Sequence, residues 1–247
     1  MNEARILVIE HQRDAGLGQL SARLAENGCV LEVVGPDTGR PLPDSLEGFD
    51  ALIVLGGSMG PTEDDRAPWL PAARDLLAEG VDRRVPTLGV CLGAQLLATA
   101  TGGHVRTMPA GPEVGLCAVR FESAAENDPL FGQLAHSEAR AVQWHWLEAD
   151  ALPADATILA SSDACRNQAF RLGDTAWGVQ FHPEALDDTV REWSVEDRAS
   201  LEQTGLAARD LIAEVRAAEG ELRGVWGGVA DRFAGVVKRA MARQPSA

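Results

Sequence analysis

The sequence of 247 residues is 45% hydrophobic and has no apolar run long enough to span a membrane, so we expect a globular protein without a transmembrane helix. The chain has 22 Lys and Arg against 37 Asp and Glu, which gives a formal net charge of −15. Without a compensating basic cluster, so acidic a chain is repelled by nucleic acids and anionic membranes, and we expect neither as a partner.

The N-terminal stretch MNEARILVIE lacks the basic region, long apolar core and small-residue cleavage site of a signal peptide. This composition favours a cytoplasmic location. Its apolar part, ARILVIE, is predicted to form the first strand.

Short apolar runs alternate with helical patterns over the first hundred residues. This alternation predicts an α/β fold with a doubly wound, mainly parallel sheet and helices on both faces, in which ligands bind beyond the carboxyl ends of the strands. The predicted strands are 4–10, 29–34, 51–57 and 87–90, and the predicted helices are 14–27, 67–80 and 93–100.

From residue 114 onward the apolar runs come closer together, which is typical of hairpins. We therefore expect antiparallel strands added to the parallel sheet. These runs are 114–121, 139–146, 157–162, 167–172 and 176–182.

The last part of the chain is predicted to be helical. We expect a first domain at 1–189 and a helical extension at 190–247 packed on it, with helices over 197–218, interrupted at Gly205, and over 221–243. The second helix carries an apolar stripe, which either covers the protein's own sheet or docks a subunit or a second copy, so a homo-oligomer is left open. The stripe consists of Leu222, Val225, Trp226, Val229, Phe233, Val236 and Val237.

The four cysteines are widely spaced, and none belongs to a CxxC pair. This spacing argues against a zinc ribbon, a thioredoxin-type motif or a disulfide framework, and no metal cluster is expected. Cys29, Cys117 and Cys165 lie in apolar stretches and are interpreted as small buried residues.

Cys91 has a different setting, in the stretch TLGVCLGAQLLA. A strand-like run precedes it, a helix-like run follows it, and Gly89 and Gly93 flank it. A sharp strand-to-helix turn needs small neighbours and exposes the side chain at its corner, where the helix N-terminus favours a thiolate. This pattern predicts a nucleophile.

A base for this cysteine is expected among the five histidines. His11, His104 and His136 lie in loop-like or polar contexts and are assigned solvated or capping roles. His182 instead ends the apolar strand AWGVQFHPE, where Glu184, two residues on, can orient its imidazole.

The motifs GVCLGAQ, LGGSMG, QWHW and GVQFHPE together resemble the class I glutamine amidotransferases, in particular the stand-alone branch related to the amidotransferase domain of GMP synthase. The resemblance covers residues 4–185 and implies a flavodoxin-like fold. It assigns Cys91 as the nucleophile that attacks the γ-carboxamide of glutamine, His182 as the base and Glu184 as the orienting carboxylate.

The same resemblance implies an oxyanion hole formed by the amides of Gly57 and Leu92, and a substrate contact from Gln95. The sequence departs from the family pattern at Ser58, where relatives commonly have proline, and at Trp146, where they usually have glycine. The substrate clamp would then be His145, Trp146 and Leu147, and the bulk of Trp146 suggests a narrowed pocket or a different γ-glutamyl substrate.

Three functions are compatible with these residues. The first is glutamine hydrolysis through a γ-glutamyl thioester on Cys91, with ammonia delivered to a separate synthase, because fewer than about sixty residues beyond the motifs cannot house one. The second is a self-sufficient γ-glutamyl peptide or amide hydrolase, and the third is a catalytically silent binding protein. No cofactor is expected, because LGGSMG lacks the lysine of a phosphate loop and no GxGxxG follows a strand.

Overall fold

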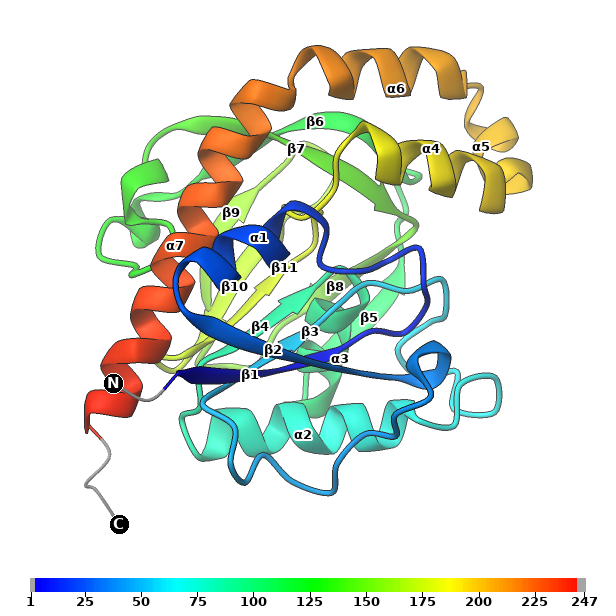
Figure 1. The fold of residues 1–247 in the computed structure, drawn as a ribbon. Helices are drawn as coiled ribbons and strands as arrows, with labels where there is room; N and C mark the ends of the chain where they lie inside the picture. Colours follow the sequence, from blue (N-terminus) through cyan, green and yellow to red (C-terminus); the bar gives the residue numbers. More distant parts are fainter. Residues whose placement is uncertain (1–2, 244–247) are drawn as a thin grey trace.

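The protein, seen in a computed structural model that describes residues 3–243, is organised around a nine-stranded sheet (Figure 1). The strand order is β2-β1-β3-β4-β11-β10-β9-β6-β7. The strands are β1 (Ala4–Ile9), β2 (Cys29–Val34), β3 (Ala51–Val54), β4 (Thr87–Val90), β6 (Glu113–Phe121), β7 (Glu138–His145), β9 (Thr157–Ser161), β10 (Ala169–Leu172) and β11 (Ala176–Val179).

The sheet has a parallel and an antiparallel half. Strands β2, β1, β3, β4 and β11 pair in parallel, whereas β10, β9, β6 and β7 join them by antiparallel pairings. All residues of β3 and β4 are buried, as expected for parallel strands covered on both faces. The predicted α/β fold with added antiparallel strands is confirmed.

Helices cover both faces of the sheet. On one face α1 and α7 pack against a core that includes Leu24 and Trp226, and on the other α2 and α3 enclose a second core that includes Leu76 and Leu96. The helices are α1 (Gly18–Glu26), α2 (Leu70–Asp82), α3 (Leu92–Ala100), α4 (Asp187–Glu196), α5 (Arg198–Thr204), α6 (Ala208–Ala217) and α7 (Glu219–Arg243). None of these helices within residues 3–243 is long and apolar enough to cross a membrane.

The sequence reasoning missed two features. A second, two-stranded sheet pairs β5 (His104–Thr107) with β8 (Leu147–Ala151), and α4 precedes the helices predicted for the extension. Three of the four β5 residues are exposed, so the strand has no apolar pattern to reveal it. Strand β8 starts two residues after β7 ends, although the two strands belong to different sheets. The sequence pattern gives no sign of a boundary between them.

The thiols other than Cys91 are unsuited to nucleophilic chemistry. Cys29 and Cys165 are buried. Cys117 was predicted to be buried but is only half-buried, like its β6 neighbours Leu116 and Ala118. Burial raises the pKa of Cys165 to about 12 and that of Cys117 to about 11, so both stay protonated near neutral pH.

The C-terminal helices pack on the same molecule. Gly205 ends α5 with a left-handed φ of 74°, as its predicted role as a break requires. Helix α7 lies along α1, and the Trp226 indole donates to the Arg140 carbonyl at 3.1 Å while its ring lies 4.7 Å from that of Phe181. Six of the seven stripe residues are buried, and Val225 is half-buried. The division into 1–189 and 190–247 stays a prediction, and its outermost residues, 1–2 and 244–247, lie outside the described residues.

This burial predicts a large loss of stability when the stripe is charged. Val229 and Phe233 are 4% and 1% exposed, so Val229→Glu and Phe233→Asp would each place an unpaired carboxylate in the core. We expect each to lower the free energy of unfolding by about 3 kcal/mol or more. Denaturant unfolding measures this loss, with Val195→Glu as the control because Val195 is 59% exposed.

A stripe that docks a partner would behave differently. In that case the charged variants would be stable monomers released from a larger assembly, which a measurement of assembly mass would reveal. That result would contradict the intramolecular role of α7.

Candidate active site

Cys91 occupies a strained corner between β4 and α3. Its φ of 50° and ψ of −105° are unusual for a residue with a side chain. Its amide donates to the Val179 carbonyl of β11 at 2.8 Å, and its carbonyl accepts the amides of Ala94 and Gln95. The backbone on both sides of the corner is therefore held, and Cys91 lies where the sequence predicted an elbow.

The two glycines that flank Cys91 are required by close packing. A Cβ on Gly93 would lie 2.0 Å from the Val54 carbonyl oxygen, and one on Gly89 would lie 2.4 Å from the Gly93 carbonyl oxygen. No larger residue fits at either position without moving backbone. The turn that presents Cys91 depends on these contacts.

His182 and Glu184 form a buried hydrogen-bonded pair. The His182 amide donates to the Val142 carbonyl of β7 at 2.8 Å, and its Nδ1 lies 2.6 Å from Glu184 Oε1. Nε2 of His182 has no hydrogen-bond partner among the described residues. A Cβ placed on Gly56 would lie 3.1 Å from His182 Cε1 and 3.8 Å from Cys91 Cβ, so the two side chains flank one point.

The charges around His182 favour its protonated form. Burial by itself lowers the pKa of this imidazole, but the negative charges of Glu184 and Cys91 outweigh burial and raise it to about 10. An imidazolium next to the sulfur stabilises a thiolate. The charges around His182 therefore fit the predicted role of Cys91, His182 and Glu184 as a triad.

Gly57 and Leu92, the residues predicted to form the oxyanion hole, lie next to each other. A Cβ on Gly57 would lie 2.9 Å from Leu92 Cδ2, so the two residues are neighbours, and neither amide donates to another of residues 3–243. The adjacent Ser58 amide donates to Gln12 Oε1 at 2.7 Å, a contact that has no signal in the sequence. This bond holds the loop at Ser58.

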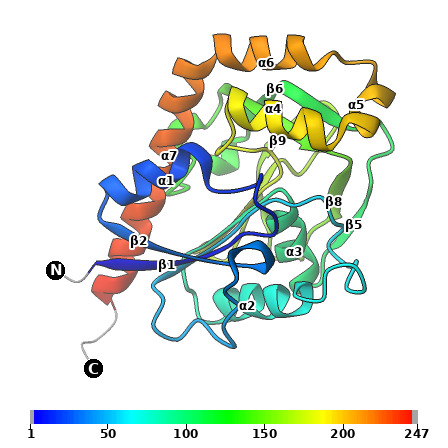
Figure 2. The same cartoon turned by 45° about the vertical axis from the view of Figure 1, so that its right-hand side comes forward.

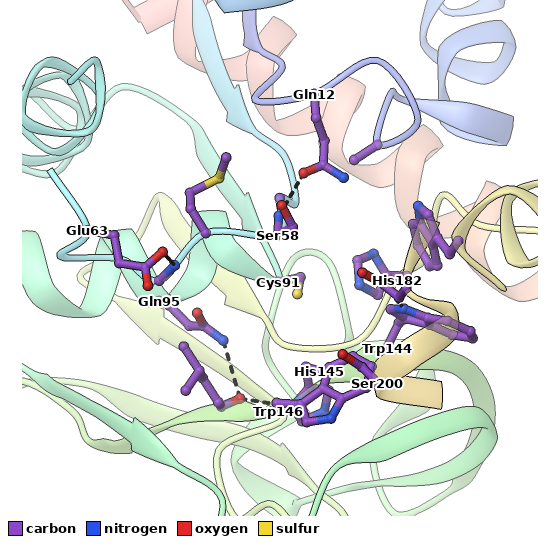
Figure 3. Close-up of a pocket in the computed structure, with 17 residues that line it drawn as sticks. Gln12, Ser58, Glu63, Cys91, Gln95, Trp144, His145, Trp146, His182 and Ser200 are labelled. Carbon is purple, nitrogen blue, oxygen red and sulfur yellow. Dashed lines mark hydrogen bonds between the residues drawn. The ribbon is translucent and has the colours of Figure 1, made fainter. Parts of the chain in front are cut away.

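A cavity of about 300 Å³ opens above these residues, and Figure 3 shows Cys91 between Gln95 and His182. Its volume is at the lower end of the range for small-molecule sites. All the predicted site residues except Leu92 and Glu184 line it. The lining consists of Gln12, Ala15, Gly57, Ser58, Met59, Gly60, Glu63, Cys91, Gln95, Trp144, His145, Trp146, Leu147, His182, Trp193, Asp197 and Ser200.

The predicted substrate contacts are joined by hydrogen bonds. Gln95 Nε2 donates to the Leu147 carbonyl at 3.3 Å and to Gln180 Oε1 at 3.2 Å, and Gln180 Nε2 in turn donates to Cys91 Sγ at 3.6 Å. His145 Nδ1 lies 2.9 Å from the same Leu147 carbonyl. Gln95 and Gln180 thus connect the Leu147 carbonyl, in the wall of the cavity, to the Cys91 sulfur by a chain of hydrogen bonds.

A buried carboxylate supports this wall from behind. Glu113 Oε2 lies 3.3 Å from His145 Nε2 and accepts a hydrogen bond from Gln168 Nε2 at 2.6 Å. The sequence did not reveal this contact, because residues 113 and 145 meet only through the β6–β7 pairing. Gln180 was missed as well, although it lies two residues before His182 and shares its side of the strand.

The remaining histidines lie outside the site, and one expectation about them is wrong. His104 and His136 are exposed and lie 2.7 Å from Asp150 and 2.6 Å from Glu126. His11, expected to be solvated or capping, is buried and accepts a hydrogen bond from the Trp69 indole at 3.0 Å. Burial lowers its pKa to about 4, so it is neutral. Its partner Trp69 directly precedes α2, and a contact between segments so far apart in the chain is not encoded by local sequence.

Comparison with known proteins places the chain in one family. The family described as "Glutamine amidotransferase class-I" matches residues 14–194. The chain is 34% identical to the subunit of GMP synthase (glutamine-hydrolyzing) from Natronomonas pharaonis that it matches, over 68% of this chain and 82% of that one. It is 28% identical to gamma-glutamyl peptidase 3 of Arabidopsis thaliana, over 58% of each chain.

The fold gives the same result. A crystal structure of a glutamine amidotransferase from Thermotoga maritima matches with a TM-score of 0.84 and 29% identity, over 95% of this chain and 99% of that one. The match extends beyond residue 194, so the C-terminal helices have counterparts in that structure.

Proposed function

Because this chain belongs to the class I glutamine amidotransferase family, we propose that it cleaves the γ-carboxamide bond of glutamine, or of a glutamine-like γ-glutamyl compound, through a thioester on Cys91. The observation that carries the proposal is the convergence of three groups on one cavity. These are the strained Cys91, the buried His182–Glu184 pair at 2.6 Å, and the neighbouring residues Gly57 and Leu92, whose amides are proposed to form the oxyanion hole.

In the first half of the reaction, the Cys91 thiolate attacks the γ-carbonyl carbon and forms a C–S bond. The carbonyl oxygen takes the negative charge and accepts hydrogen bonds from the amides of Gly57 and Leu92. The His182 imidazolium gives its Nε2 proton to the leaving nitrogen as the C–N bond breaks. Ammonia or an amine leaves, and the γ-glutamyl group stays on the sulfur.

In the second half, neutral His182 takes a proton from water, and the resulting hydroxide attacks the thioester. Glutamate leaves and the thiolate is restored. Glu184 accepts a hydrogen bond from the Nδ1–H group of His182 throughout and stays ionised, which fixes the tautomer and stabilises the imidazolium. Gln180 donates to the sulfur and so keeps it oriented towards the substrate.

Two destinations for the nitrogen are proposed. In the first, ammonia passes to a synthase on another chain, as the name of the GMP synthase relative suggests. In the second, the protein is a self-sufficient γ-glutamyl amide or peptide hydrolase, which the relative named gamma-glutamyl peptidase 3 and the bulk of Trp146 in the cavity favour. A silent binding protein is disfavoured because the triad is complete.

Ammonia and amine release by the isolated chain tests the proposal. The purified protein is given glutamine and a panel of γ-glutamyl amides, and acid-quenched samples are searched by mass spectrometry for a γ-glutamyl adduct on Cys91. Turnover with an adduct on Cys91 supports the mechanism. An absence of both release and adduct with every compound would leave only the silent binding protein.

Replacement of Trp146 is expected to change specificity. Trp146 lines the cavity and lies edge-on to Trp144, with ring centroids 6.3 Å apart. Trp146→Gly should therefore change the ratio of kcat/KM between different γ-glutamyl substrates by about tenfold and so alter their rank order. The reason is that a pocket contact acts on some substrates more than others. Trp146→Phe, which keeps an aromatic ring, serves as the control. A uniform decrease for every substrate would assign Trp146 to packing.

A further inference from the structure

The cavity extends past Cys91 to a wall formed by the extension. Trp193 of α4, Asp197 at the junction of α4 and α5, and Ser200 of α5 line it and are called the α4–α5 wall below. Figure 2 shows α4 and α5 together at one end of the molecule. The Trp193 indole donates to the Asp14 carbonyl at 2.9 Å, which fixes the wall to the loop after β1.

The α4–α5 wall lies on the side of Cys91 where the leaving nitrogen is proposed to be protonated. The ring centroids of Trp193 and His182 are 4.5 Å apart. Figure 3 shows His182, Trp144 and Ser200 on the same side of Cys91, opposite Gln95. Since His182 protonates the leaving nitrogen, that nitrogen must lie on this side. A substituent on the nitrogen would extend towards the wall, whereas ammonia from glutamine would leave the wall unused.

The wall carries a carboxylate without a cationic partner. Asp197 is the N-cap residue of α5, but its side chain makes no capping hydrogen bond, and its Oδ2 accepts the Trp144 indole hydrogen at 2.8 Å. Within residues 3–243 no Lys, Arg or His nitrogen lies within 4.0 Å of this carboxylate. Glu63, the other carboxylate of the cavity, is paired with Arg66 at 3.1 Å. Asp197 therefore contributes an uncompensated negative charge.

The aromatic rings next to this carboxylate add to its preference for a cation. Trp144 and Trp193 lie 5.8 Å apart with their planes at 46°, and both border the cavity. Indole faces attract ammonium groups. No Lys or Arg is among the lining residues, and the His182 imidazolium is already paired with Glu184, so an anionic leaving group would meet the Asp197 carboxylate without a compensating charge of its own.

We propose that Trp144 and the α4–α5 wall form a subsite for a cationic substituent on the leaving nitrogen, so that the preferred substrate is a γ-glutamyl amide of a diamine. The proposal rests on the thioester chemistry proposed above and adds a substrate class to it. The γ-carbonyl forms a C–S bond with Cys91, the C–N bond breaks, and His182 protonates the nitrogen. Water then hydrolyses the thioester, so glutamate and the diamine are the products.

The test compares two substrates of the same shape. One is the γ-glutamyl monoamide of 1,4-diaminobutane, and the other is γ-glutamyl-n-pentylamide, in which a methyl group replaces the ammonium. The native protein should show a higher kcat/KM for the cationic compound by about 10- to 100-fold, the usual range for a charged hydrogen bond. Asp197→Asn keeps an oxygen that can accept the Trp144 indole hydrogen but removes the charge, and it should abolish this ratio while activity on the pentylamide persists.

Asp163→Asn is the matched control, because it removes one negative charge from a 95% exposed position and should leave the ratio unchanged. A ratio near one in the native protein, or an equal loss on both substrates in Asp197→Asn, would overturn the subsite. Failure of the thioester chemistry is distinguishable from this, since then no compound, glutamine included, would form an adduct on Cys91. That result would overturn the subsite together with the proposed function.

Discussion

Cys91→Ser is expected to lower kcat/KM by about 10³-fold or more while the protein keeps its fold and stability. Serine is nearly the same size as cysteine, so the turn held by Gly89 and Gly93 has no steric reason to change. The hydroxyl is much less acidic than a thiol, and an imidazolium that stabilises a thiolate does not ionise it. The corner would remain, but the nucleophile would be lost.

Initial rates with the best substrate, together with thermal unfolding of both proteins, measure this effect. Cys29→Ser is the matched control, because it makes the same substitution at another buried cysteine, on β2 and outside the cavity lining. It should keep its activity. Near-normal activity in Cys91→Ser, or an equal loss in Cys29→Ser, would contradict the assignment of Cys91 as the nucleophile.

The parts of the site that could be predicted are those that local sequence encodes. A run of buried strand residues, a cysteine between two small glycines and a helix-forming stretch define the Cys91 corner within about a dozen residues. The spacing of His182 and Glu184 is equally local, because alternate residues of an extended segment share a side. The order of strands and helices followed from the same kind of periodicity, which gave the α/β class.

The parts that were missed depend on segments far apart in the chain. Glu113 meets His145 only because β6 and β7 pair, and Asp197 reaches Trp144 only because the junction of α4 and α5 packs beside β7. His11 reads as a loop residue, yet the Trp69 indole donates to it from fifty-eight residues away. Such contacts are decided by tertiary packing, which periodicity does not report.

The same limit explains why the extension could not be assigned in advance. An apolar stripe on a helix predicts that the stripe is covered but does not identify the covering surface. In the structure α7 covers the protein's own sheet. The polar and aromatic residues of α4 and α5, which gave no periodic signal of a site, instead form part of the cavity.

His182→Asn is expected to lose nearly as much activity as Cys91→Ser, to within about tenfold, whereas Glu184→Gln should lose only about 10²-fold. Asparagine has no group that can move a proton between the substrate nitrogen and water, so both halves of the reaction fail. Glutamine at 184 can still accept from Nδ1 through its carbonyl oxygen, but it has lost its charge. Equal losses in all three variants would refute this division of roles.

The pH profile of Glu184→Gln separates an orienting carboxylate from one that only fills space. In the native protein, burial lowers the pKa of His182, but the charges of Glu184 and Cys91 raise it to about 10, and the imidazolium is lost only as the pH rises through that region. With the Glu184 charge removed, burial has more weight and His182 loses its proton at a lower pH. The alkaline limb of kcat/KM, which reports the Cys91–His182 pair in the free enzyme, should therefore move to lower pH in the variant. An alkaline limb at the native position, with activity reduced equally at every pH, would mean that Glu184 acts on His182 through packing and not through its charge.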